Sequence, residues 1–121
     1  MVTDGAQTTS LADGLAALAD AADRTEPLTL VVPVVEAVPP WLVGLAAAAH
    51  DQGARVLVSA EPPAGATGEA ADGWEIGVCT AALAAGVDDV VGIDPRRVTR
   101  VRAVIEATRR ATMAPPAEQP A

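Results

Sequence analysis

The chain has 121 residues, enough for one domain with a single core, and its net charge of −8 disfavours nucleic acid and anionic membranes as partners. One cysteine, Cys79, excludes an intrachain disulfide, and no basic segment followed by an apolar run marks a signal peptide. We therefore expect a cytoplasmic protein that partners with neither nucleic acid nor membrane.

A flexible N-terminal segment is predicted over residues 1–8, followed by a helix over residues 11–24. Ser10 is suited to the N-cap, and Asp13 three residues later resembles the second half of a capping box. Helical spacing predicts that this helix buries one apolar face. The residues of that face are Leu11, Leu15, Leu18 and Ala22.

Residues 28–35 are apolar and rich in valine, which is typical of a strand buried on both faces of a parallel sheet. We expect Pro33 to end the ladder of this strand, because proline has no N–H to donate. A second helix is predicted from Pro40 to about Gln52, with Gly53 at its C-terminal stop. Residues 55–60 then form a second short strand.

Residues 61–73 contain two prolines and three glycines and are predicted to be a mobile loop. A helix over residues 74–85 and a strand over residues 87–93 follow. Asp94 and Pro95 supply an N-cap acid and a first-turn proline, so they predict the start of a last helix that runs to about residue 110. Residues 111–121 are expected to be a disordered tail rich in proline and alanine.

This order of elements predicts the fold class. Strands joined through helices of ten or more residues must run parallel, and their crossovers are right-handed. We expect an α/β fold over residues 9–110: a small three-layer (α/β/α) domain with a parallel sheet of three to four strands.

Four stretches, in their order, resemble the later part of a response-regulator receiver domain. They are residues 11–32, 39–60, 81–95 and 96–111, and AALAAGVDDVV within the third is the most specific. The resemblance implies a flavodoxin-like fold that lacks the first strand–helix unit of a receiver.

The resemblance also implies that phosphorylation chemistry is lost. A receiver accepts phosphate on an aspartate at the end of its third strand, and Pro33 stands at that position. Ser59 and Ala60 match the Ser/Thr–Ala pair after the fourth strand, whereas Ile93 replaces the lysine after the fifth. The acidic pair that binds magnesium belongs to the missing strand, so we expect no metal and no other cofactor.

Six arginines against one acid, Glu106, give residues 95–111 a net charge of +5. Four of these arginines are candidate contacts for an acidic surface, that of a second copy of this chain or of a partner protein. They are Arg96, Arg97, Arg100 and Arg109. The alternative interpretation is a solvated helix face.

The leading hypothesis is therefore a non-catalytic, receiver-like module for protein interaction or regulation. One alternative is a small protein or enzyme that binds a metabolite or nucleotide at the carboxyl ends of the strands. The polar residues expected there are Glu36, Ser59, Glu61 and Asp94. A further alternative is a fragment or subunit of a larger split α/β protein.

Overall fold

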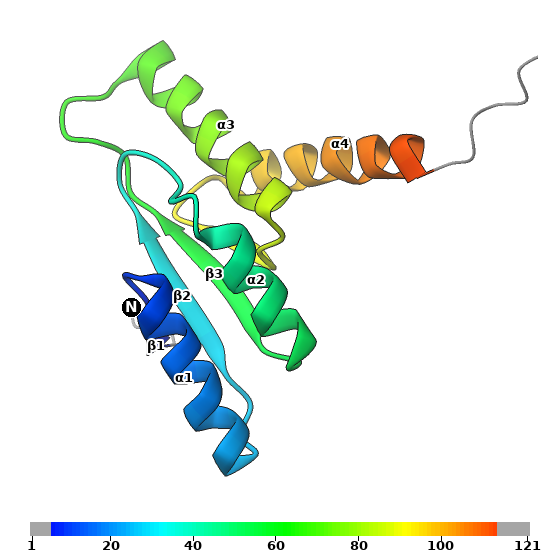
Figure 1. Cartoon of the computed structure of the whole chain (residues 1–121). Helices are drawn as coiled ribbons and strands as arrows, with labels where there is room; N and C mark the ends of the chain where they lie inside the picture. Colours follow the sequence, from blue (N-terminus) through cyan, green and yellow to red (C-terminus); the bar gives the residue numbers. More distant parts are fainter. Residues whose placement is uncertain (1–5, 114–121) are drawn as a thin grey trace, which may run out of the picture.

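The computed structural model describes residues 6–113 (Figure 1). In chain order it contains β1 (Ala6–Gln7), α1 (Leu11–Arg24), β2 (Thr29–Val34), α2 (Leu42–Asp51), β3 (Arg55–Ala60), α3 (Gly68–Ala85), β4 (Asp89–Val91) and α4 (Pro95–Met113). The predicted α/β fold class is confirmed, with four parallel strands and four helices. No helix within residues 6–113 has the length and apolar character needed to cross a membrane.

The strands lie in the sheet in the order β1-β2-β3-β4, which is their order in the chain. The central pair, β2 and β3, is in register from Thr29 opposite Arg55 to Val34 opposite Ala60. β1 pairs directly with β2 on one side, and β4 pairs with β3 on the other. Each crossover thus moves one strand further in the same direction, and right-handed crossovers of this kind place their helices on the same face of the sheet.

The contacts among the helices agree with that arrangement, since α1 packs on α2, α2 on α3, and α3 on α4. Figure 1 shows α1 and α2 side by side in front of β2 and β3. The strand residues of the core alternate in sequence, as expected for one face of a sheet. They are Leu30, Val32, Val34, Val56, Val58, Ala60 and Val90.

Pro33 does not end β2 as expected, because the strand continues to Val34. On the side of β3, the carbonyls of Leu28 and Val34 accept hydrogen bonds from Arg55 and from Glu61, the residue after β3. The carbonyl of Val31 instead accepts one from Thr8, on the side of β1. Odd-numbered residues of β2 therefore point their backbone groups toward β1. Since β1 ends at Gln7, opposite Val31, no donor is needed at Pro33.

α1 begins as predicted, with the Ser10 side chain accepting a hydrogen bond of 3.1 Å from the backbone N–H of Asp13. Its buried face is rotated from the predicted one: Gly14, Leu18 and Ala21 are buried, whereas Leu15 is 44% exposed. The rotation has a packing reason, because Gly14 lies directly against the side chain of Leu45 in α2. A glycine at that point allows the two helices to approach closely.

Other boundaries also differ from the sequence prediction: β4 covers only Asp89–Val91 of the predicted strand 87–93. α3 begins at Gly68, six residues before the predicted start, so much of the expected loop is helical. α4 continues to Met113, beyond the predicted end at 110, and its second half is exposed and extends away from the sheet (Figure 1). β1 lies within the segment predicted to be flexible, while residues 1–5 and 114–121 lie outside the described part of the chain.

Candidate functional site

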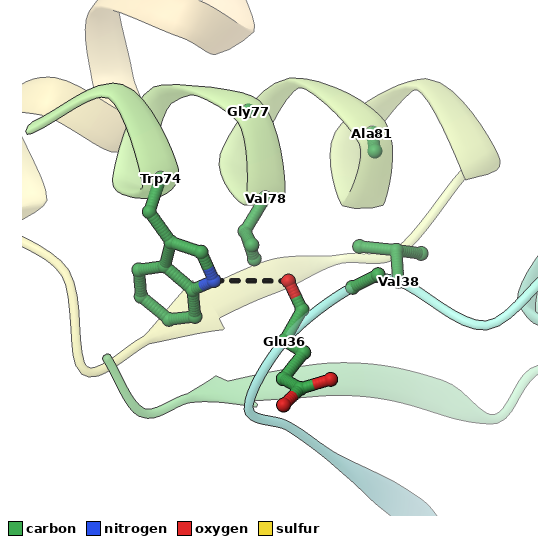
Figure 2. A pocket seen from close by; sticks show the side chains of 7 residues that line it. Glu36, Val38, Trp74, Gly77, Val78 and Ala81 are labelled. Carbon is green, nitrogen blue, oxygen red and sulfur yellow. Dashed lines mark hydrogen bonds between the residues drawn. The ribbon is translucent and has the colours of Figure 1, made fainter. Parts of the chain in front are cut away.

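A hollow of about 340 Å³ lies at the carboxyl edge of the sheet, where ligands bind in parallel α/β folds. One wall is the loop that follows β2, and the other is the middle of α3, from Trp74 to Ala81. The indole Nε1 of Trp74 donates a hydrogen bond of 3.0 Å to the backbone carbonyl of Glu36 and ties the two walls together (Figure 2). The remaining lining is small and mostly apolar: Ala37, Val38, Gly77, Val78 and Ala81.

The carboxylate of Glu36 does not serve this hollow. Figure 2 shows it pointing away from Trp74 and Val78, and Glu36 is exposed. Only the backbone of Glu36 contributes a polar group, and that group is already bonded to the indole. The hollow therefore offers an apolar surface and no charged group that could orient a polar substrate.

The other predicted pocket residues have separate structural environments. Ser59 is half-buried in β3, in register with Pro33 on one side and Val91 on the other. Glu61 is exposed, and its backbone N–H donates to the carbonyl of Val34. No hydrogen bond within residues 6–113 joins the side chains of these residues to each other or to Glu36.

Asp94 forms the predicted N-cap of α4. Its Oδ1 accepts the backbone N–H of Arg96 at 2.9 Å, and its Oδ2 lies 3.2 Å from the guanidinium of the same arginine. The hydrogen bond from the Arg96 side chain is the main reason that the pKa of Asp94 lies below its ordinary value. Asp94 is thus occupied in starting the helix.

These observations bear on catalysis at the strand ends. Ser59 lies within β3, and Glu36, Glu61 and Asp94 follow β2, β3 and β4, but no contact within residues 6–113 assembles the four into a nucleophile–base pair. Within the described residues, no group of three or more histidine, cysteine or acidic side chains could hold a metal ion. The polar residues near the strand ends of the described chain therefore do not form one catalytic or metal-binding site.

Two of the four arginines of the predicted face, Arg97 and Arg109, attach α4 to α3. Arg97 lies 3.1 Å from Glu75 and 3.4 Å from Asp72, both on α3. Arg109 donates to the carbonyls of Leu83 and Ala84 at the C-terminal end of α3, where helix carbonyls lack partners within the helix. The arginines therefore stabilise the α3–α4 contact.

Arg100 is different. It is exposed and forms no ion pair or side-chain hydrogen bond within residues 6–113. It lies at the rim of an apolar groove between α3 and α4. The apolar residues of this groove are Ile76, Val101, Val104 and Ile105, and Val104 is 65% exposed.

The structure also reveals a contact that the sequence did not indicate. The Oδ2 atom of Asp88 accepts the backbone N–H of Val56 at 2.7 Å and lies 3.3 Å from Nε2 of His50. Asp88 thus joins the end of α2 to the beginnings of β3 and β4. Only the adjacent acidic pair at 88 and 89 marked this position in the sequence, and that pair is equally common on solvated surfaces.

Cys79 is fully buried in the core, and this burial is the main cause that raises the pKa of its thiol. A buried thiol with a raised pKa is a poor nucleophile, since the thiolate is the reactive form. Cys79 therefore acts as a small packed side chain.

Comparisons with known proteins add no family assignment: no protein-family model, curated protein or solved structure matches the chain. The functional argument depends on the geometry of the chain itself.

Proposed function

We propose that this chain is a non-catalytic protein-interaction module, and that the groove between α3 and α4 binds an amphipathic helix with acidic flanks on a partner protein. The observation that carries the proposal is the combination of an exposed apolar strip with a cation at its rim, Arg100, that has no ion-pair partner among residues 6–113. Val104 is 65% exposed and Ile76 is 47% exposed, although both are large apolar side chains. Contiguous exposed apolar surface of this kind is typical of an interaction site.

Charge supports the choice of an acidic partner. Residues 95–111 have six arginines and one acid, so the electrostatic potential at the groove favours a carboxylate-rich ligand. Arg96 is already paired with Asp94, and Arg97 with Glu75. Arg100 is therefore the residue best placed to set the charge preference of the groove.

The proposal does not depend on receiver chemistry. By the sequence resemblance alone, Pro33 and Ile93 occupy the positions of the aspartate and lysine of a receiver. A receiver also keeps its first strand at the centre of the sheet, whereas β1 lies at an edge of the sheet formed by residues 6–113. We propose that the similarity to receivers concerns the individual strand–helix units and an interaction role without phosphorylation.

A fluorescent peptide helix with leucines on one face and glutamates beside them tests the proposal, with a lysine-for-glutamate version as its matched control. The glutamate peptide should bind, and Arg100→Glu should reverse the preference in favour of the lysine peptide. Val104→Asp should weaken both peptides by placing a charge in the apolar strip. Equal binding of both peptides to the native protein and to Arg100→Glu would contradict the proposal.

The hollow beside Trp74 supports a second candidate function, the binding of a small apolar ligand. A thermal-shift screen of small apolar and aromatic compounds tests this function, because a ligand that binds the folded state raises its stability. Gly77→Leu would fill the hollow, since a Cβ at Gly77 meets no atom within 4 Å. Stabilisation that survives in this variant would place the ligand elsewhere.

A further inference from the structure

The sheet has a second face that does not belong to the described core. Alternate residues of β2, β3 and β4 lie on it, in layers set by the register: Val31 with Leu57 and Asp89, then Pro33 with Ser59 and Val91. Leu57 and Val91 are half-buried and have no place in the core cluster.

The helices of the described residues leave this face without a helical layer. Right-handed crossovers place α1, α2 and α3 on the opposite face, and Val98, Val101 and Ile105 of α4 pack against the same core as those helices. Parallel sheets normally have both faces covered. Val31 on this face is already only 1% exposed, so the half-buried Leu57 and Val91 supply the apolar surface that a further layer of protein would bury.

Both edges of the sheet are also open within residues 6–113, since β1 pairs only with β2 and β4 only with β3. Beside β4 the open edge forms a groove of about 330 Å³ with α4. Residues 89–93 line one side of the groove, and Val98, Thr99 and Arg102 line the other. The backbone N–H of Val90 donates to the Asp89 carboxylate, 2.9 Å away, rather than to another strand. An added strand fits such an edge.

We propose that two copies of this chain close an eight-stranded parallel (β/α)₈ barrel, in which β4 of each copy pairs with β1 of the other. Four strand–helix units in sequential order, with their helices on one face, are the geometric half of such a barrel. Closure removes all four open edges and turns the uncovered face into the barrel interior.

The outer helices argue for a second copy as the occupant. In the closed ring, the flank of α4 that faces away from α3 lies beside the flank of α1 that faces away from α2. α4 contains six arginines and one glutamate, although Arg97 and Arg109 among them bind α3, and α1 contains three aspartates and one arginine. Asp13 and Asp20 are exposed on α1, as is Arg110 on α4. One chain thus supplies both halves of a complementary contact, and a two-fold axis repeats it.

The polar residues of the interior face suit this arrangement. Arg55 lies at the amino-terminal end of β3, at the lower mouth of the barrel, where its charge remains hydrated. Val31, Leu57 and Asp89 share the next layer, in which the Asp89 carboxylate lies 3.4 Å from the guanidinium of Arg102 on α4. This interface is separate from the groove between α3 and α4, so each can fail without the other.

Native mass spectrometry and sedimentation of the full chain measure the association. We expect a dimer, and we expect Leu57→Asp to raise its dissociation constant at least roughly tenfold, because the interior would then bury a charge. Val43→Asp is the matched control, since Val43 is 57% exposed on α2 and away from the proposed interface. Arg100→Glu should also leave the dimer intact. A native chain that stays monomeric at high concentration would overturn the proposal.

A cross-linking experiment distinguishes the barrel from other dimers and does not depend on the folding of Leu57→Asp. In a Cys79→Ala background, a Gln7→Cys chain is mixed with an Asp89→Cys chain and treated with a short bis-maleimide. The barrel predicts cross-linked heterodimers, because the free edges of β1 and β4 meet. The same Gln7→Cys chain mixed with a Val43→Cys chain should give none. Cross-linking to Val43 without cross-linking to Asp89 would refute the barrel.

Discussion

Replacement of Gly92 by alanine should destabilise the domain strongly. Gly92 follows β4 directly and has a φ of +90°, a conformation that residues with a Cβ adopt at a cost of about 1–2 kcal/mol. A Cβ at this position would also clash with the backbone carbonyl oxygen of Ala60 and lie 3.2 Å from its carbon. Relief of that overlap must move one strand away from the other, which typically costs about 1–3 kcal/mol. The expected loss is therefore about 2–5 kcal/mol, a large fraction of the ~5–15 kcal/mol that holds a domain together.

Urea unfolding monitored by circular dichroism measures this loss. Gly44→Ala is the matched control, because Gly44 lies within α2 and an added Cβ meets no atom within 4 Å. It should raise the free energy of unfolding by about 0.5–1 kcal/mol through the helix propensity of alanine. Gly92→Asn separates the two causes, since asparagine tolerates left-handed φ but carries the same Cβ. If Gly92→Ala unfolds within about 0.5 kcal/mol of the native chain, the reasoning is wrong.

Three further predictions concern single contacts. Asp88→Ala should lower the free energy of unfolding by about 1–3 kcal/mol in urea titrations, because the N–H of Val56 loses its acceptor. A variant as stable as the native chain would show that water replaces the carboxylate. Trp74→Phe should cost about 0.5–1.5 kcal/mol by the same measurement, since phenylalanine cannot donate to the carbonyl of Glu36; an unchanged midpoint would make that bond irrelevant to stability. Burial raises the pKa of Cys79 in the folded chain, so the thiol of the unfolded chain loses its proton at a lower pH. The free energy of unfolding should therefore fall as the pH rises above ~8.5. Cys79→Ala should remove this part of the pH dependence, and a variant with the same pH profile as the native chain would contradict the prediction.

Local sequence signals predicted the elements whose ends depend on short-range chemistry. The Ser10 side chain caps α1 through the N–H of Asp13, and Asp94 caps α4 through the N–H of Arg96. Both bonds span two or three residues, so their partners are fixed by spacing along the chain. β3 occupies the predicted residues 55–60 for a similar reason: a short apolar run is bounded by a glycine turn and a pair of prolines.

The start of α3 was less predictable because the residue that stabilises it, Arg97, is distant in the chain. Residues 68–73 read as loop from their glycines, yet Asp72 is helical and lies 3.4 Å from Arg97 on α4. Leu15 illustrates the same limit, since the close approach of Gly14 to Leu45 rotates α1 and leaves Leu15 exposed. A helical period identifies a helix, but the neighbouring element decides which side is buried.

The sequence by itself determined a parallel α/β domain, because apolar strands alternate with helices long enough to cross between parallel strands. It also marked the residues at the strand ends and the arginines of the last helix. Only the tertiary structure decided what those residues do. It pairs β1 directly with β2, commits Arg97 and Arg109 to α3, and leaves Arg100 free at an apolar groove. Strand order and ion-pair partners depend on contacts between residues far apart in the chain. The spacing of residues along a sequence does not indicate which distant helix or strand packs beside a given element.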